Sequence, residues 1–439
     1  MSAAAGSASL GTATPSAVAT AAGGLRAGVA YGGLGLPLAF VALPLYVVLP
    51  SHYATALGVP LAALGVLLLA ARLLDAFADP WIGRRADAWF AHSTPRVLAM
   101  AAMAAVVLAG SFYALFFPPV RGPGALLIWC GALLALTYLS YSVLSVVHQA
   151  WGARLGGNAT QRARIVAWRE GLALAGVLVA SVLPALAGLG TTSAVFAITL
   201  AIGVALLAVA PRSAAGPTDA AGATPQSMRL PLANPAFRRL LLVFMVNGVA
   251  SALPATLVLF FIRDRLQLPT YEPLFLFAYF AAGAVSMPLW VRAVASFGLA
   301  RLWLAGMGLA IAAFVWAATL GPGDLVAFTA ICITSGLALG ADLALPSSLL
   351  AGVIQRAGHA GRAEGAYFGW WNFAIKLNLA LAAGLALPLL SRFGYTPGTR
   401  DTDALLALAL AYGLLPCALK LLAGVLLVGI WMRTPHGEH

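Results

Sequence analysis

The sequence predicts an all-α polytopic membrane protein. It has 439 residues, of which 62% are hydrophobic and only 9% are charged, whereas about 25% of the residues of a soluble protein are charged. Apolar segments of roughly 20 residues or more recur from end to end, and each is long enough to cross a hydrocarbon core of about 30 Å as a helix. A transmembrane barrel would show shorter segments of alternating polarity instead.

We expect twelve transmembrane helices, because twelve apolar segments alternate with polar loops. Taken in chain order as spans 1 to 12, they lie near residues 27–49, 60–83, 95–117, 123–153, 163–188, 192–211, 237–262, 272–293, 300–320, 324–355, 362–391 and 403–431. Before span 1, residues 1–25 are rich in Ala, Gly, Ser and Thr and have no basic region leading into a short apolar core. This is not the pattern of a cleaved secretory signal, so we expect a disordered cytoplasmic tail.

The loops between the spans are basic on one side. A formal net charge of +12 could indicate a nucleic-acid partner, but the positions of the arginines indicate topology instead. Most loop arginines lie on the side of the N-terminus, and those of the opposite loops are Arg121, Arg263, Arg265, Arg392 and Arg400. Because basic loops face the cytoplasm, we expect both termini there, an integral protein of a bacterial inner membrane, and no nucleic-acid partner.

The longest polar interruption, residues 211–239, is rich in Pro, Ala, Gly and Thr, as a flexible linker is. It divides the chain into a six-helix bundle at 26–211 and a second at 237–432, joined by a cytoplasmic linker at 212–236 and followed by a cytoplasmic tail at 433–439. Two six-helix halves joined in this way are typical of the major facilitator fold, in which substrate and coupling ion bind near the midplane between the halves.

Span 2 carries two aspartates, Asp75 and Asp79, and Pro80 follows the second. A spacing of four residues places both carboxylates on one face of a helix, and an ionisable group at this depth is costly unless it meets a partner, a cavity or an ion. Static buried ion pairs that fix helix packing are the alternative. Two carboxylates this close repel each other, however, and a bound cation or a proton relieves the repulsion. We therefore predict an H⁺ or Na⁺ site at Asp75 and Asp79, with no other metal and no cofactor.

Three basic residues are candidate charge partners of this pair. Arg72 lies three residues before Asp75 and can reach the same face of the helix. Lys376, in span 11, is one of only two lysines, and a buried lysine can give up its charge whereas an arginine cannot. Arg169, in span 5, could serve either the aspartates or an anionic substrate. The other lysine, Lys420, is interpreted as structural, because near a predicted helix end its amine could extend to the interface.

Polar and aromatic residues inside the other spans are candidates for lining a substrate cavity. For the aromatic side chains the alternative is core packing, and for the histidine it is a buried ring whose hydrogen bonds are satisfied. The candidates are His148, Gln149, Trp151, Glu170, Asp342, Tyr367, Trp371 and Asn372.

The segment ARLLDAFADPWIGRRAD resembles the signature of the glycoside–pentoside–hexuronide cation symporters, the melibiose-permease branch of the major facilitator superfamily. The family pattern there is Arg-x-x-Asp-x-x-x-Asp-Pro-x-x-Gly, which Arg72, Asp75, Asp79, Pro80 and Gly83 match. The resemblance extends over nearly the whole chain. It implies that the two span-2 carboxylates bind the coupling cation.

Two further segments are similar to the same family. In AWREGLALAG, Arg169 takes the place of the family's span-5 arginine. In EGAYFGWWNFAIK, Glu364, Tyr367 and Lys376 keep the spacing of the family's glutamate, tyrosine and span-11 lysine. That lysine interacts with the span-2 carboxylates in the family, so the resemblance implies the same contact for Lys376.

The chain also departs from the family pattern. Sugar-transporting members place acidic residues in spans 1 and 4, where this chain has Leu36, Pro37 and Val147. Because a sugar needs several buried hydrogen-bonding groups, we expect a cavity poor in such groups and a substrate other than a simple galactoside. A span-4 hydroxyl that lies near the family's cation site is replaced by Leu144, which favours H⁺ over Na⁺.

Together these features predict a secondary active transporter. It would couple symport of an organic solute, such as a glycoside or an organic acid, to H⁺ or Na⁺ by alternating access, as a functional monomer among membrane lipids. The alternative is a cation-coupled carrier or flippase of a lysolipid or other amphiphile, since this branch includes lysophospholipid symporters. An apolar cavity with a lateral opening would favour the amphiphile, and a closed, hydroxyl-rich cavity the polar solute. A membrane-embedded enzyme is a remote alternative, because no nucleophile–base, HExxH or phosphate-loop pattern occurs.

Overall fold

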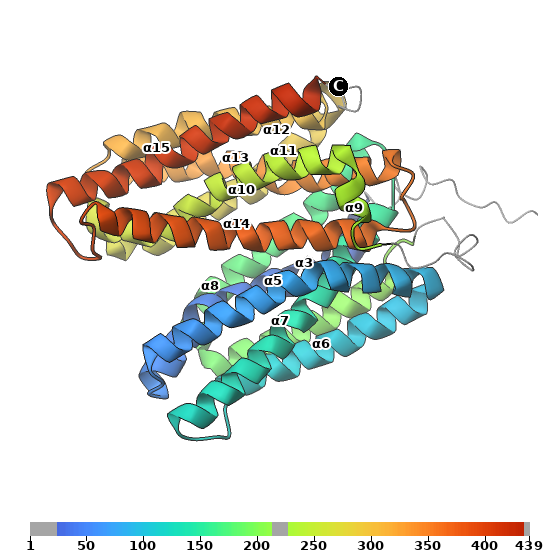
Figure 1. The fold of residues 1–439 in the computed structure, drawn as a ribbon, viewed down its shortest axis with the longest axis horizontal. Helices are drawn as coiled ribbons and strands as arrows, with labels where there is room; N and C mark the ends of the chain where they lie inside the picture. Colours follow the sequence, from blue (N-terminus) through green and yellow to red (C-terminus); the bar gives the residue numbers. More distant parts are fainter. Residues whose placement is uncertain (1–23, 213–226, 434–439) are drawn as a thin grey trace, which may run out of the picture.

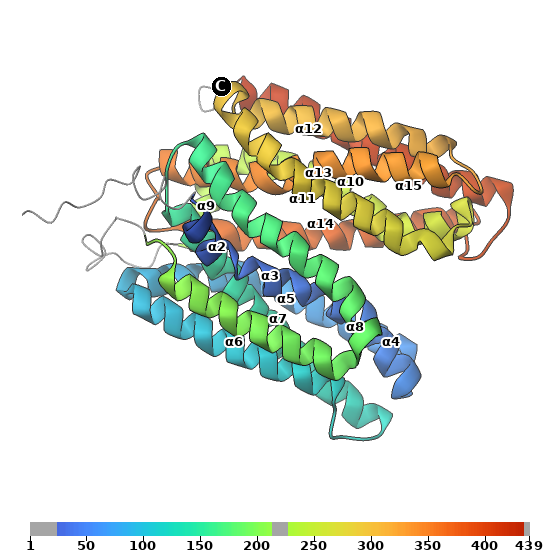
Figure 2. The ribbon, with the colours of Figure 1, turned by 180° about the vertical axis from the view of Figure 1, so that it is seen from behind.

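The computed structural model describes residues 24–212 and 227–433. Residues 1–23 of the predicted tail at 1–25, residues 434–439 of the predicted tail at 433–439, and residues 213–226 of the predicted linker at 212–236 fall outside these ranges. The described chain is built from helices, and Figures 1 and 2 show them gathered into two bundles, one coloured blue to green and the other yellow-green to red.

The first bundle begins with a broken span. Helix α2 (Leu25–Gly32) bends by 40° into α3 (Gly35–Phe40), and two π-helical turns flank the short α4 (Leu49–Ser51). Longer helices follow: α5 (Leu61–His92), α6 (Thr94–Phe116), α7 (Pro123–Arg154) and α8 (Ala159–Val209). Helix α8 changes direction at Gly188, whose φ of 75° lies in the left-handed region, so it supplies spans 5 and 6.

A short helix, α9 (Leu230–Ala233), leads into the second bundle. The bundle comprises α10 (Pro235–Phe260), α11 (Glu272–Phe297), α12 (Leu299–Phe314), α13 (Leu325–Arg356), α14 (Glu364–Arg392) and α15 (Thr402–Leu426). N-cap residues explain where two of these helices begin. The Asn234 side chain accepts hydrogen bonds from the first turn of α10, and that of Asp401 from the first turn of α15.

The described helices match the predicted number of spans. Ten are long and apolar enough to cross a membrane, and the bent pair α2–α3 makes eleven. Helix α5 has the length, at 32 residues, but its middle carries Arg72, Asp75 and Asp79; with it the count is twelve. The protein is therefore an α-helical integral membrane protein.

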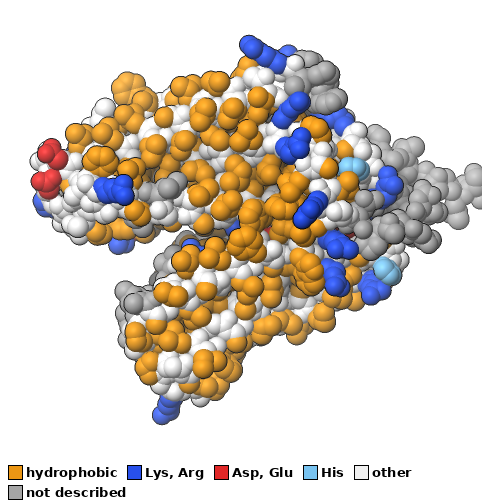
Figure 3. Space-filling model, viewed as in Figure 1, with side chains coloured by type: hydrophobic (Ala, Val, Ile, Leu, Met, Phe, Trp, Pro, Cys, Tyr) orange, Lys and Arg blue, Asp and Glu red, His pale blue; other side chains and the backbone are white. Residues whose placement is uncertain are grey.

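The two bundles meet at one end and diverge at the other (Figure 1). The space-filling view in Figure 3 shows a hollow between the two lobes on the left, and Lys and Arg side chains gathered at the opposite end. The closed end is thus the end that the arginine distribution predicts to be cytoplasmic.

Glycines bring α5 and α14 into close contact across the boundary between the bundles. A Cβ at Gly83 would clash with the carbonyl oxygen of Gly365, and one at Gly369 would lie 2.5 Å from the carbonyl oxygen of Asp79. The backbones of α5 and α14 are therefore in direct contact at these glycines. Gly83, a residue of the span-2 signature, has this structural role.

Candidate functional site

Lys376 of α14 joins the two aspartates of α5 across the boundary between the bundles. Its Nζ lies 2.6 Å from Asp75 Oδ1 and 2.8 Å from Asp79 Oδ2. The Ser142 hydroxyl, from α7, donates a hydrogen bond of 2.7 Å to Asp75 Oδ1 and accepts one of 2.7 Å from Lys376. Asp79 is fully buried and Asp75 nearly so. We call these four residues the charge cluster.

The charge cluster contains two carboxylates and one ammonium, so one negative charge is left over when all three are ionised. Neither oxygen of Asp79 accepts a hydrogen bond of good geometry from the described residues, whereas Asp75 is bonded by Ser142. A buried charge without full compensation is costly. A proton on Asp79, or a monovalent cation between the carboxylates, would remove the excess. Such a cation competes with Lys376 for the same oxygens.

Arg72 does not join the charge cluster, contrary to prediction. Its guanidinium lies over the ring of Tyr46, 4.4 Å from the ring centre, and the ion pairs found among the described residues join Asp75 and Asp79 to Lys376. The physical reason is that Lys376 already contacts both carboxylates, while the ring of Tyr46 offers Arg72 a cation–π contact.

A hydroxyl is present at the charge cluster, so the premise drawn from Leu144, that the cation site lacks one, is wrong. Leu144 is buried in the core of the first bundle, and Ser142 supplies the oxygen from two residues earlier on α7. The argument that favoured H⁺ over Na⁺ therefore loses its basis.

A cavity of about 550 Å³, which we call the central cavity, lies between the bundles, and Lys376 lines it. Arg169 and Glu170 form an ion pair of 2.6 Å in its wall. Hydroxyl and amide groups come from both bundles, on Tyr46, Tyr141, Ser145, Gln149, Asn247, Ser251, Ser347, Asn372 and Asn378. The expectation of a cavity poor in hydrogen-bonding groups is therefore wrong. It rested on three positions in spans 1 and 4, whereas these groups come from other positions of those spans and from α10, α13 and α14.

Five of the predicted cavity residues line this cavity: Gln149, Glu170, Asp342, Trp371 and Asn372. Gln149 Nε2 donates a hydrogen bond of 3.0 Å to Asn372 Oδ1 and so links α7 to α14. Trp371 stacks on Phe244, with ring centres 3.8 Å apart. The cavity thus combines polar groups with a flat aromatic wall.

Three other predicted cavity residues lie elsewhere. His148 bonds to the backbone oxygen of Tyr31 at 2.7 Å, and Trp151 donates to the backbone oxygen of Pro211 at 2.9 Å. The Tyr367 hydroxyl bonds to an asparagine and a histidine near the closed end. Each of these three side chains makes its hydrogen bonds to nearby protein groups outside the cavity. A polar or aromatic residue type alone does not distinguish such a position from one that lines a cavity.

Lys420 is buried rather than extended to the interface, contrary to its interpretation from sequence. It is 8% exposed, and its Nζ lies 2.7 Å from Asp342 Oδ2, 2.9 Å from Asn247 Oδ1 and 3.0 Å from Ser251 Oγ. Helical structure continues beyond α15 through π-helical turns to Met432, so Lys420 lies well inside the span.

Polar contacts at the closed end form a second connection between the bundles, which we call the latch. Asp87 accepts hydrogen bonds from the backbone N–H groups of Gly365 at 2.7 Å and Ala366 at 2.8 Å. Arg154 Nη2 lies 3.3 Å from Asp87 Oδ1 and 3.1 Å from Glu364 Oε2. The carboxylate also meets the positive end of the α14 dipole. Sequence analysis did not single out Asp87.

The latch and the charge cluster lie on the same pair of helices. Asp75, Asp79, Gly83 and Asp87 recur every four residues, so they form one stripe along α5. This stripe packs against α14 from Lys376 to the start of the helix. The charge cluster and the latch therefore lie along one continuous contact between α5 and α14.

Comparison with known proteins agrees with this architecture. A profile of the family described as MFS/sugar transport protein matches residues 27–431. The inner membrane symporter YicJ of Escherichia coli (strain K12) is 29% identical over 134 residues, which make up 30% of this chain and 28% of YicJ. The chain thus aligns with under a third of the length of that relative.

Solved structures of similar fold are transporters. A bacterial homologue of the iron transporter ferroportin, in an outward-facing state, has a TM-score of 0.68 at 17% identity, covering 92% of this chain and 99% of that one. The human organic anion transporter MFSD10 has 0.65 at 19%, and the E. coli fucose:proton symporter FucP 0.62 at 13%, each with the same coverage. At these identities the similarity concerns the fold alone, and it confirms the predicted major facilitator fold.

Proposed function

The chain belongs to the MFS/sugar transport protein family and is a transporter rather than an enzyme, and we propose that it carries a polar organic solute together with H⁺ or Na⁺ by alternating access. The observation that carries this proposal is the bridge from Lys376 to Asp75 and Asp79. It joins one bundle to the other, and Lys376 also lines the central cavity. One residue therefore connects cation binding, solute binding and the contact between the bundles.

The coupling follows from the charge count. When H⁺ or Na⁺ neutralises Asp79, Lys376 loses one of its two carboxylate partners and its ammonium becomes available to a solute oxygen in the cavity. Cation and solute then favour each other's binding by the same free energy, as linkage requires. Because the ion pairs of Lys376 span the two bundles, their rearrangement also changes the cost of rocking one bundle against the other.

The cavity favours a polar solute over a lysolipid. More than half of the residues that line it carry a charge, an amide or a hydroxyl, and a solute with several hydroxyl groups would satisfy them. The half-buried ring of Phe244, which stacks on the buried Trp371, offers an apolar face for a sugar-like ring. A glycoside or another polyhydroxylated compound is the substrate class that these groups fit best.

The test is gradient-driven uptake. Purified protein in liposomes is given a Na⁺ gradient or a pH gradient, each alone, with a panel of radiolabelled glycosides and organic acids. We expect at least one solute to accumulate above its external concentration with one of the two gradients and not with an ionophore present. Equilibration without accumulation under both gradients, for a solute that the protein demonstrably carries, would refute coupling.

Ser142→Ala should identify the coupling ion. Losing an oxygen ligand to a charged group costs about 1.5–3 kcal/mol, so we expect the apparent Na⁺ affinity to fall roughly 10-fold to 100-fold if Na⁺ is coupled. A proton needs no second ligand, so H⁺-driven uptake should change much less. The matched control is Ser140→Ala, which removes a buried hydroxyl from the same helix outside the charge cluster. Equal changes in both variants would show that Ser142 is not a cation ligand.

A further inference from the structure

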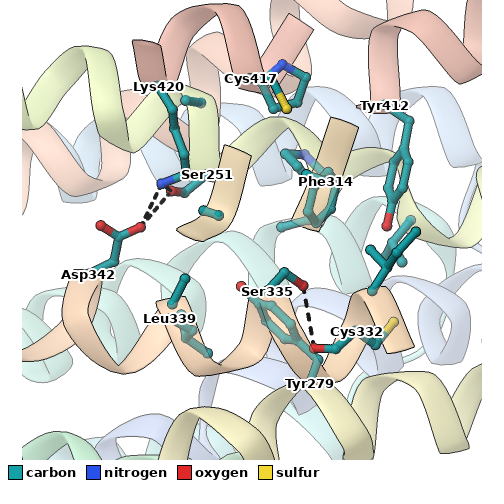
Figure 4. A pocket seen from close by; sticks show the side chains of 18 of the residues that line it. Ser251, Tyr279, Phe314, Cys332, Ser335, Leu339, Asp342, Tyr412, Cys417 and Lys420 are labelled. Atoms are coloured by element: carbon teal, nitrogen blue, oxygen red, sulfur yellow. Dashed lines mark hydrogen bonds and ion pairs between the residues drawn. The ribbon is translucent and has the colours of Figure 1, made fainter. Parts of the chain in front are cut away.

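A second cavity, of about 180 Å³, lies inside the second bundle (Figure 4). Residues of α10, α11, α12, α13 and α15 line it, and aromatic side chains form much of its wall, among them Tyr279, Phe314 and Tyr412. Its polar contacts are the hydrogen bond from Ser335 to the backbone oxygen of Cys332, at 3.4 Å, and, at one end, the bonds that join Ser251, Asp342 and Lys420. We call this space the side cavity.

The side cavity adjoins the central cavity, because Ser251, Leu339 and Asp342 line both. Their junction is polar but neutral. Asp342 accepts hydrogen bonds from Lys420 at 2.7 Å and Ser251 at 3.3 Å on Oδ2, and from Asn247 at 3.1 Å on Oδ1. The charges of Asp342 and Lys420 compensate each other. A solute that extends from one cavity into the other would therefore place a neutral group at this junction.

The size of the side cavity limits what it can hold. A cavity of roughly 150 Å³ lined by apolar side chains stays dry and binds benzene, so 180 Å³ accommodates one six-membered ring. An extended acyl chain is several times longer than such a ring and does not fit. Close packing is the rule in protein interiors, and a void of this size weakens the fold unless something occupies it.

We propose that the transported solute carries one ring-sized apolar substituent, which occupies the side cavity while the polar part of the solute binds in the central cavity. The proposal rests on the proposed function and narrows its substrate class. The solute would be an amphipathic compound such as an aryl glycoside, with its neutral linking atoms beside the pair of Asp342 and Lys420. Burying a phenyl-sized group is worth roughly a 30-fold gain in affinity.

Two of the three cysteines of the chain provide a direct readout, since Cys332 and Cys417 line the side cavity and Cys130 is buried in the first bundle. Protein in lipid nanodiscs is treated with N-ethylmaleimide, and alkylation of each thiol is followed by mass spectrometry. Benzyl alcohol should slow alkylation of Cys332 and Cys417 at least about tenfold without protecting Cys130, whereas methanol at the same concentration should protect none. Equal rates with and without benzyl alcohol would overturn the proposal, as would stronger protection by lysophosphatidylcholine.

A cavity-filling variant provides the second readout. Ala255 is exposed and lines the side cavity, so Ala255→Phe should fill it without overpacking the core. The matched control is Ala312→Phe, an exposed position on α12 that does not line it. We expect the first variant to lose protection by benzyl alcohol and the second to keep it. Ser335→Leu serves the same purpose should Ala255→Phe fail to fold.

Substrate preference is tested with matched pairs of solutes. Methyl and phenyl β-glycosides of glucose, galactose and xylose are compared by their effect on the melting temperature of the protein. For at least one sugar the phenyl member should bind roughly 30-fold more tightly, and Ala255→Phe should remove the difference. Equal affinity within every pair would overturn the proposal. These binding measurements need no gradient, so a failure of coupled uptake and a failure of the side cavity are distinguished.

Discussion

Asp79→Asn is expected to abolish accumulation while leaving exchange of solute across the membrane. The asparagine has nearly the shape of the carboxylate but no charge, so it resembles a site that is permanently neutralised. Lys376 keeps Asp75 as a partner, but cation binding no longer changes the charge of the cluster. One charge moving through 100 mV supplies about 2.3 kcal/mol, which supports roughly 50-fold accumulation, and we expect this ratio to fall to about one.

Liposome assays separate the two activities. Gradient-driven uptake measures coupling, and counterflow with equal cation on both sides measures exchange alone. Asp403→Asn, which removes an exposed carboxylate at the start of α15, is the matched control and should accumulate solute as the unmodified protein does. Undiminished accumulation by Asp79→Asn would rule out a role for this carboxylate in coupling.

Asp87→Asn is expected to shift the protein away from the state seen here, in which the latch is closed. The substitution removes the negative charge that meets Arg154, Gly365 and Ala366. Breaking a buried ion pair costs roughly 3 kcal/mol, which corresponds to a change of about 100-fold in the ratio of the two states. The closed end should therefore open in a substantial fraction of molecules without any ligand.

Distances between spin labels measure this shift. With the three native cysteines replaced, one label is placed in the loop at 117–122 and another in the loop at 393–401, both at the open end of the molecule. The distance between them should shorten in Asp87→Asn. Glu272→Gln breaks an exposed ion pair within the second bundle, which is worth little, and should leave the distance unchanged. The same result for both variants would mean that the latch does not set the conformational equilibrium.

Asp75 and Asp79 could be predicted from the sequence as members of the charge cluster, because both lie on one helix and their spacing along the chain fixes their relative positions. Asp75 and Asp79 face the same way since they are one turn apart. Lys376 was selected by residue type and family resemblance, and the structure places it against both carboxylates. Whether these three carry the coupling stays a prediction that the substitutions above test.

The residues that sequence analysis misjudged depend on packing between helices. Ser142 meets Asp75 because α7 lies beside α5, and Lys420 is buried because α15 packs against α10 and α13. Arg72 turned to an aromatic ring of the first span. None of these contacts follows from spacing along one helix.

The sequence by itself determined the class of the protein, its twelve helices and the aspartate pair, because hydropathy and helical periodicity act over roughly 20 residues. Only the tertiary structure decided which groups meet. It brought Lys376 to the pair, set Asp87 against the start of α14, and opened a ring-sized space beside Asp342. The physical reason is that two buried charges pair only when two helices bring them within a few ångströms, and the approach of α5 and α14 depends on glycines in both.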